Sequence, residues 1–218
     1  MGLPSHGLAV GFGDAMVAYH RPTMKLRNVF LGAALFAGAL AVGRWSSGRE
    51  GRGVDAELFG EGNRDRGPGP DRFFTGVTEL GSIWAAGGAA GVLALTGRRR
   101  AAANAFAAAG VAWLAGQGLK KVANRPRPYI ADVGGTRLLV GPPNATSWPS
   151  SHPAVLAAFT SVAGRDLGLG VGTRTGLAGL GVSVAASRVY VGVHYPSDVV
   201  SGLLIGRAIG RLWPRRRT

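Results

Sequence analysis

The sequence contains no cysteine, which excludes disulfide bonds and thiolate metal sites. Charge is also scarce, because Asp, Glu, Lys and Arg make up 17% of the 218 residues, against roughly 25% in an average soluble protein. Acidic residues are the rarer kind, with 11 of them against 25 basic residues and a net charge of +14. A basic nucleic-acid-binding protein groups such charges with aromatic residues on one accessible face. Here the basic residues stand between apolar runs, which favours a membrane protein without a nucleic-acid partner.

Hydrophobic residues are abundant, at 46%, and they form six mostly apolar runs. The runs cover residues 28–43, 73–97, 101–119, 153–164, 175–193 and 199–213. A membrane-spanning helix needs about 20 such residues, and the many Ala and Gly residues allow helices to pack closely in a bilayer. We therefore predict an all-α fold, a bundle of six transmembrane helices over residues 28–213. A soluble, Ala-rich helical bundle is the alternative, and the basic residues at the ends of the runs favour the membrane.

The distribution of arginine predicts the orientation of this bundle. Basic residues gather in the N-terminal segment 1–27, at Arg98–Arg100, in the turn with Arg165 and Arg174, and in the tail 214–218. Cytoplasmic connections carry such an excess, so both ends of the chain are expected in the cytoplasm. Residues 44–72, interpreted as a polar loop, and the connections 120–152 and 188–198 then lie outside. The excess of Arg over Lys suggests a GC-rich bacterial genome, and hence a location in the bacterial cell (inner) membrane.

The first residues contain a second possible start of translation. Met24, Lys25 and Arg27 precede the first apolar run, an arrangement that resembles a signal sequence or signal anchor. Because no small-residue cleavage site follows clearly, we expect an uncleaved anchor. Translation from Met24 is the alternative to translation from residue 1.

Three polar clusters lie at the ends of apolar runs, on the side predicted to be external. The first is Lys120 with Arg127 and Pro128, the second is Pro149–His152, and the third is Ser187–Arg188 with His194 and Asp198. Lys120, Arg127 and Arg188 supply three cations, and guanidinium groups bind phosphate oxygens in pairs. The clusters therefore indicate phosphate chemistry.

Two prolines place other polar residues at helix starts. Pro153 suits the first position of a helix whose N-cap lies just before it, and the exposed N–H groups there bind anions. Pro196 opens the last run in the same way and puts Asp198 in its first turn. An Asp near His194 can hold the tautomer of that imidazole, and the second histidine, His152, can act as a general acid.

Each cluster also has a purely structural interpretation. Lys120, with its neighbours Lys121 and Arg125 in the stretch that leads to Pro128, can be an interfacial anchor. His152 can be a helix cap, and His194 with Asp198 can be a structural pair. Arg188 is harder to explain in this way, because an ionisable residue inside an apolar run is functional by default. Two histidines and a carboxylate also suggest a metal site, but three neighbouring cations would repel a divalent ion. We therefore expect no metal and no cofactor.

The order of the clusters resembles the three-part signature of the type-2 phosphatidic acid phosphatase (PAP2) superfamily. That signature reads Lys-x6-Arg-Pro, Pro-Ser-x-His and Ser-Arg-x5-His-x3-Asp, and the resemblance covers residues 70–213, about two-thirds of the chain. The superfamily also includes bacterial non-specific acid phosphatases and vanadium haloperoxidases. The resemblance implies a membrane phosphatase with the helical fold of these enzymes.

The resemblance also implies a role for each matching residue. His194 would attack phosphorus and form a phosphohistidine, oriented by Asp198. His152 would protonate the leaving group and then help to activate water. The phosphate oxygens would be bound by the other matching residues, Lys120, Arg127, Ser150, Ser151 and Arg188. The family most often has Gly where Ser151 stands, and Gly permits a close approach of the backbone or an unusual backbone angle.

Three functions are compatible with these features. The first is an integral membrane phosphatase acting on a lipid phosphate or prenyl diphosphate, such as phosphatidic acid, phosphatidylglycerophosphate, undecaprenyl diphosphate or a polyprenyl phosphoribose. Its partners would be the lipid substrate and the bilayer, and the sequence leaves the oligomeric state open. The second is a vanadate-dependent haloperoxidase, against which the apolar runs argue. The third is a non-catalytic membrane scaffold or transporter subunit, against which the presence of every motif residue argues.

Overall fold

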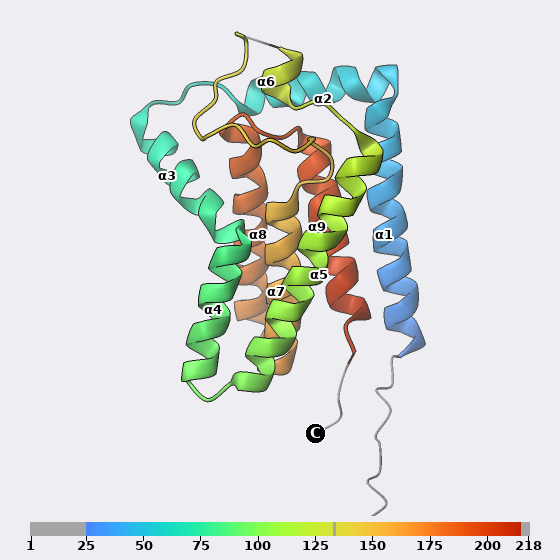
Figure 1. Ribbon diagram of the computed structural model, residues 1–218, viewed down its shortest axis with the longest axis vertical. Coiled ribbons are helices and arrows are strands. Elements are labelled where there is room, and N and C mark those ends of the chain that lie inside the picture. Colours follow the sequence, from blue (N-terminus) through green and yellow to red (C-terminus); the bar gives the residue numbers. More distant parts are fainter. Residues whose placement is uncertain (1–24, 133, 215–218) are drawn as a thin grey trace, which may run out of the picture.

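The computed structural model of the chain describes residues 25–132 and 134–214. Every regular element in these ranges is a helix (Figure 1), which confirms the predicted all-α fold. In chain order the elements are α1 (Leu26–Ser47), α2 (Arg49–Gly62), α3 (Pro68–Thr78), the 3₁₀ turn η1 (Glu79–Gly81), α4 (Ile83–Leu95), α5 (Arg99–Ala123), α6 (Pro128–Ala131), α7 (Ser151–Asp166), α8 (Val171–Tyr190) and α9 (Pro196–Leu212). The alternative start at Met24 and most of the terminal segments 1–27 and 214–218 lie outside the described residues.

The long helices α1, α4, α5, α7, α8 and α9 run side by side along the longest axis of the molecule (Figure 1). Each overlaps a predicted apolar run, although α4 covers only the second half of the run 73–97. α7 packs against α5, α8 and α9, and the core it shares with α5 consists largely of alanine with Val155, Phe159 and Val162. α2 and α6 lie across one end of the bundle (Figure 1). The C-terminal ends of α5 and α8 and the N-terminal ends of α7 and α9 meet at this end.

One helix is long and apolar enough to cross a membrane by itself. This helix is α1, which has 22 residues. α3 and η1 together with α4 would count as a second span if they were taken as one broken helix. No other helix among the described residues meets this test of length and composition. The count of six spanning helices therefore stays a prediction.

The predicted run 73–97 is not one helix, because the chain bends by 67° between α3 and α4. The break contains η1 and Ser82, whose hydroxyl accepts a hydrogen bond from the N–H of Ala85 at 3.0 Å and caps α4. η1 packs against the start of α7, where a Cβ on Gly81 would lie 2.8 Å from the Cβ of His152. The bend and the missing side chain therefore bring this segment against a residue predicted to be catalytic.

The predicted polar loop 44–72 is mostly helical, which corrects the expectation of an irregular connection. Although α2 is not apolar overall, Asp55 and Phe59 lie four residues apart on its buried face. After α2, the side-chain amide of Asn63 donates to the carbonyl oxygen of Tyr190 at 2.8 Å. This contact holds the connection against the end of α8.

α9 packs against α7 through glycines. A Cβ on Gly202 would lie 2.3 Å from the carbonyl oxygen of Ser150, and a Cβ on Gly206 would lie 2.3 Å from that of Ala154. The two backbones can approach this closely only because neither glycine has a side chain. The N–H of Ser150 then donates to the carbonyl oxygen of Asp198 at 3.0 Å. The glycines therefore fix the relative position of two helices that carry predicted site residues.

We expect Gly206→Ala to lower the Tm in detergent, because the added methyl group meets the backbone of α7. Overpacking of this kind costs about 1–3 kcal/mol, which corresponds to roughly 2–12 °C in a chain of this size. Gly88→Ala in α4 is the matched control, since a Cβ there meets nothing within 4 Å and the Tm should stay equal or rise slightly. Thermal unfolding followed by circular dichroism measures both variants. Equal Tm values would contradict the close packing of α9 on α7.

Candidate active site

The residues predicted to form the site all lie at one end of the bundle. They occupy the last turn of α5 (Lys120), the N-cap of α6 (Arg127), the start of α7 (Ser150, Ser151, His152), the last turn of α8 (Arg188), the connection after it (His194) and the first turn of α9 (Asp198). All are buried except His152, which is half-buried. Segments far apart in the sequence thus form one polar cluster inside an apolar bundle.

The first cluster is shaped by the way α5 ends. Asn124 has a φ of 43°, the left-handed conformation that terminates a helix, and Pro126 cannot continue it. The chain turns back so that the side chain of Arg127 is buried. There its Nε donates to the carbonyl oxygen of Ala145 at 2.6 Å, and its Nη1 donates to that of Val193 at 2.8 Å. The guanidinium group is thereby fixed beside His194.

Of the two helix starts predicted from proline, one is confirmed and one is shifted. α9 begins at Pro196, and Asp198 lies in its first turn. α7 begins at Ser151, two residues before Pro153, which still lies in the first turn, where a backbone N–H is not needed for the helix. In both helices the polar residues lie at the N-terminus, whose partial positive charge favours an anion.

Ser151 stands where the PAP2 superfamily, which the sequence resembles, most often has glycine. Gly116 of α5 leaves room for the side chain of Ser151. A Cβ on Gly116 would lie 2.8 Å from the hydroxyl oxygen of Ser151. That hydroxyl accepts a hydrogen bond from Nζ of Lys120 at 3.2 Å and so holds the ammonium group at the start of α7. Ser151 has no positive φ. The backbone conformation therefore does not require glycine at this position.

His194 lies between α8 and α9 and is only 2% exposed. Its Nε2 lies 3.2 Å from Nη1 of Arg127. Because a guanidinium group can only donate, this contact requires an unprotonated Nε2, and the neutral ring then carries its proton on Nδ1. Nδ1 lies 3.4 Å from Oδ2 of Asp198 without the alignment of a hydrogen bond, and such contacts commonly tighten when substrate binds. The lone pair on Nε2 is what a nucleophilic imidazole needs.

Asp198 is fully buried and held by three donors that the sequence did not reveal. Its carboxylate accepts hydrogen bonds from the hydroxyl of Ser147, from the N–H of Tyr195 at 2.9 Å and from Nη1 of Arg125 at 2.8 Å. Nη2 of Arg125 also binds Oδ2 of Asp55 in α2 at 2.6 Å. Arg125, for which an interfacial anchor was one interpretation of the sequence, is instead a bridge between two buried carboxylates.

Arg188 extends from the last turn of α8 toward α3, where its Nη1 donates to Oγ1 of Thr78 at 2.8 Å. Thr78 is completely buried and ends α3, immediately before the break at η1. The bend between α3 and α4 therefore helps to position this arginine. Sequence reasoning missed Thr78, because a single threonine in an apolar run gives no signal of such a contact.

Besides Nδ1 of His194, two donors in the cluster are buried and have no hydrogen-bond partner among the described residues. They are Oγ of Ser150 and Nε of Arg188. A buried donor without a partner costs about 1–3 kcal/mol. An oxyanion bound between the start of α7 and the end of α8 would accept hydrogen bonds from both.

Within residues 25–132 and 134–214, no group of three or more His, Asp or Glu side chains lies close enough together to hold a metal ion. Three cations, Lys120, Arg127 and Arg188, act electrostatically on His194, and Arg127 contacts it. This donor set suits an anion rather than a cation. Catalysis without a metal stays a prediction.

The pKa of His194 is held well below its ordinary value of 6.5, chiefly by burial and then by the cations Arg127, Arg188 and Lys120. A lowered pKa keeps the imidazole neutral at pH values where a free histidine is protonated. As the pH falls, kcat/KM should decrease when His194 becomes protonated. We therefore expect this decrease to occur below pH 6.5. The pH profile should be corrected for the titration of the substrate phosphate, which phosphorus NMR measures. If kcat/KM, after this correction, fell at pH 6.5 or above, the result would contradict the lowered pKa of His194.

Comparison with known families and curated proteins links the chain to phosphatases. The model of the PAP2 superfamily matches residues 100–217, which include all three clusters. The chain is 35% identical over 126 residues to decaprenylphosphoryl-5-phosphoribose phosphatase of Mycobacterium tuberculosis, covering 56% of this chain and 64% of that protein. It is also 35% identical over 119 residues to the protein of the same name from Mycolicibacterium smegmatis, covering 55% and 62%. The match thus spans slightly less than two thirds of the length of these relatives.

Two solved structures resemble the fold. A transmembrane PAP2-type phosphatidylglycerolphosphate phosphatase from Bacillus subtilis gives a TM-score of 0.67 at 23% identity, covering 83% of this chain and 92% of that one. LpxE from Aquifex aeolicus gives a TM-score of 0.64 at 29% identity, covering 71% of this chain and 90% of that one. The arrangement of helices is therefore similar to that of these proteins over most of their length.

Proposed function

The chain belongs to the PAP2 superfamily, and from that premise we propose that it hydrolyses the phosphate ester of a membrane lipid through a phosphohistidine intermediate. The observation that carries the proposal is the 3.2 Å contact between Nε2 of His194 and Nη1 of Arg127. It lies in a cluster that also contains the buried cations Lys120 and Arg188. Guanidinium and ammonium groups bind the oxygens of a phosphoryl group. A phosphate held in this way would present its phosphorus to the lone pair of His194.

In the proposed first step, Nε2 of His194 bonds to phosphorus while the bond from phosphorus to the lipid oxygen breaks. His152 gives a proton to that leaving oxygen. In the second step, His152 takes a proton from water, and the resulting nucleophile displaces His194 from phosphorus and releases inorganic phosphate. In both steps Lys120, Arg127 and Arg188 stabilise the charge on the equatorial oxygens.

The residues around this centre support the proposed steps. Bonding of phosphorus to Nε2 leaves a positive charge on the imidazole of His194, which the carboxylate of Asp198 stabilises from 3.4 Å away. The hydroxyl of Ser150, which has no partner among the described residues, would donate to a phosphate oxygen. The N–H groups around Ser151, at the start of α7, would do the same.

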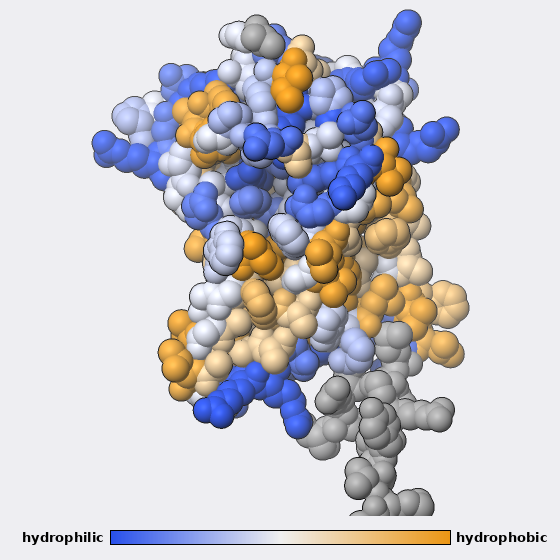
Figure 2. Space-filling view, in the orientation of Figure 1, coloured by the Kyte–Doolittle hydropathy of each residue, from blue (hydrophilic) through white to orange (hydrophobic). Residues whose placement is uncertain are grey.

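We also propose that the bundle lies in the bacterial cell membrane with the site at the external face. Large apolar side chains cover its outside, among them Trp84 and Leu95 of α4, which are 86% and 90% exposed. Figure 2 shows an apolar band over α1, α4 and α5, between a hydrophilic end formed by α2, α3 and α6 and hydrophilic residues at the opposite end. Exposed apolar surface of this kind indicates a lipid or protein partner. Basic residues at the end opposite the site favour the cytoplasm for that end.

For the substrate we propose a phosphate carried by a prenyl lipid, in the class of polyprenyl phosphoribose compounds. The support is the name of the mycobacterial relatives, which describes a phosphatase acting on a decaprenylphosphoryl-5-phosphoribose. A buried polar cluster at the end of an apolar bundle suits such a molecule, because its phosphate can enter the cluster while its chain stays in the bilayer. Each methylene buried against the helices contributes about 0.8 kcal/mol, or roughly fourfold in affinity.

The test is phosphate release by the purified full-length chain in detergent micelles with EDTA present. The panel should contain a polyprenyl phosphoribose phosphate, phosphatidic acid, phosphatidylglycerophosphate and undecaprenyl diphosphate, with long-chain and short-chain versions of one headgroup. We expect the long-chain version to have a much higher kcat/KM than the short-chain version. Equal turnover of the two would point to a non-specific phosphatase that is only anchored in the membrane. Activity that requires Mg²⁺ or Zn²⁺ would contradict the metal-free mechanism.

A further inference from the structure

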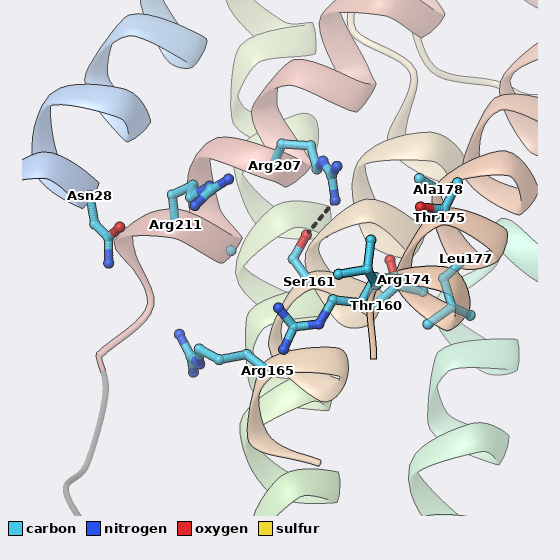
Figure 3. Close-up of a pocket in the computed structure, with 12 residues that line it drawn as sticks. Asn28, Thr160, Ser161, Arg165, Arg174, Thr175, Leu177, Ala178, Arg207 and Arg211 are labelled. Carbon is cyan, nitrogen blue, oxygen red and sulfur yellow. Dashed lines mark hydrogen bonds between the residues drawn. The ribbon is translucent and has the colours of Figure 1, made fainter. Parts of the chain in front are cut away.

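A cavity of about 320 Å³ lies at the end of the bundle opposite the candidate active site. It is lined by four arginines, Arg165, Arg174, Arg207 and Arg211, which come from the end of α7, the start of α8 and the end of α9. Figure 3 shows Arg207 reaching from α9 toward Ser161 of α7. The separation of residues 152 and 165 along α7 corresponds to about 20 Å. The cavity is therefore separate from the site that contains His152.

The arginines that line this cavity outnumber the acidic residues near them. None of the described residues that line the cavity is Asp or Glu, and Asp166 pairs with Arg165 at 2.8 Å. Arg207 has a neutral partner, the hydroxyl of Ser161, at 3.5 Å. Arg174 likewise donates to a backbone carbonyl oxygen of α7 at 3.0 Å. Arg165 is half-buried and the other three arginines are exposed, and four cations beside one carboxylate give a positive potential, which a bound anion would relieve.

Phosphate fits the chemistry and the size of this cavity. Guanidinium groups bind phosphate oxygens in pairs, and Ser161 and Thr175 add hydroxyl groups to the lining. Its volume falls at the lower end of the roughly 300–1,000 Å³ of small-ligand sites. At a cytoplasmic membrane face, phosphate is present on anionic lipid headgroups, and basic pockets between helices bind such headgroups.

We propose that this cavity is a second phosphate-binding site, which holds the phosphate of an anionic lipid headgroup or free inorganic phosphate. The bound phosphate bridges α7, α8 and α9 at one end of the bundle. The opposite ends of the same three helices carry His152, Arg188 and Asp198. Binding therefore stabilises the helices on which the candidate active site is built, without contact with the substrate.

The test is thermal unfolding of the full-length protein in neutral detergent with phosphatidylglycerol, phosphatidylcholine or inorganic phosphate added. Phosphatidylglycerol is expected to raise the Tm by roughly 5–10 °C at a concentration about 100-fold above Kd, and phosphatidylcholine is not. The double variant Arg174→Gln/Arg207→Gln should lose most of this rise. Arg98→Gln/Arg100→Gln removes the same charge from the exposed start of α5, and this control should keep the rise in Tm. A rise with inorganic phosphate that the cavity variant loses identifies free phosphate as the ligand, whereas a rise with phosphatidylglycerol alone identifies the lipid headgroup.

Thr175→Glu tests the site independently of any loss of stability in the double variant. Thr175 lines the cavity, so the new carboxylate supplies a counter-charge to the arginines. This variant should unfold at an equal or higher Tm without lipid and show no further rise with phosphatidylglycerol. Equal lipid-dependent rises in the wild type, Thr175→Glu and the double variant would overturn the proposal. Such a result would mean that the lipid acts only through general attraction to a basic surface.

Discussion

His194→Ala is expected to reduce phosphate release from a lipid substrate by roughly 10⁴-fold or more. The substitution removes the lone pair that faces the cations, while Lys120, Arg127 and Arg188 remain to bind the phosphate. The loss should therefore fall on kcat, with a smaller change in KM. Mass spectrometry of wild-type enzyme quenched at alkaline pH should find a phosphate on His194, and the variant should carry none.

His152→Ala is the matched control for this experiment, because it removes the other histidine of the cluster. Its proposed role in the first step is to protonate the leaving oxygen, and p-nitrophenolate leaves without a proton. With p-nitrophenyl phosphate, His152→Ala should therefore regain much of its rate of phosphoenzyme formation, whereas His194→Ala should not. Full turnover of lipid by His194→Ala would exclude the phosphohistidine mechanism.

The parts of this site that could be predicted from the sequence are those with a local signal. Pro196 and Asp198 are two residues apart, and their spacing alone places the carboxylate in the first turn of α9. The apolar runs likewise predicted α1, α5, α7, α8 and α9, whereas the run 73–97 contains both the end of α3 and α4. The start of α7 was predicted two residues late, because Pro153 is tolerated anywhere in a first turn.

The parts that could not be predicted depend on contacts between distant residues. α2 has only a few apolar side chains, and one of the residues on its buried face is Asp55, so the segment resembled a polar loop. Asp55 meets Arg125 and Ser197 only after α1, α2 and α9 have packed. The fit of Ser151 against Gly116 also has no local signal. The break at η1 is different, because Ser82 is a typical N-cap residue inside the predicted run and could have indicated it.

Arg125→Gln is expected to lower kcat by roughly 10²–10³-fold, within the loss of about 10⁴-fold caused by altering an orienting carboxylate. Arg125 binds Asp198 at 2.8 Å and Asp55 at 2.6 Å, and the two carboxylates are 0% and 2% exposed. Without the guanidinium group both charges are buried and unpaired, which costs about 3–5 kcal/mol. Asp198 then moves or takes up a proton, and the imidazole of His194 loses its orientation.

Arg125 hydrogen-bonds neither His194 nor the residues predicted to bind phosphate, so its loss should affect the orientation of His194 and not the binding of substrate. KM should therefore change little while kcat falls, when rates are normalised to the amount of phosphoenzyme formed in a burst. Arg125→Lys should restore part of kcat, since an ammonium group keeps the charge but cannot bind two carboxylates through a rigid fork. A variant that bound substrate poorly at unchanged kcat would show instead that Arg125 contacts the phosphate.

A double-mutant cycle with Asp55→Asn tests whether the bridge acts as a unit. Asp55→Asn alone leaves Arg125 paired with Asp198, so kcat should fall less than in Arg125→Gln. In Arg125→Gln/Asp55→Asn only one unpaired carboxylate remains, and the loss in Tm should be smaller than the sum of the two single losses. Additive losses would mean that α2 does not act on Asp198 through Arg125. If Arg125→Gln kept the wild-type kcat, the positioning role of the bridge would be wrong, because the carboxylate would then hold His194 without it.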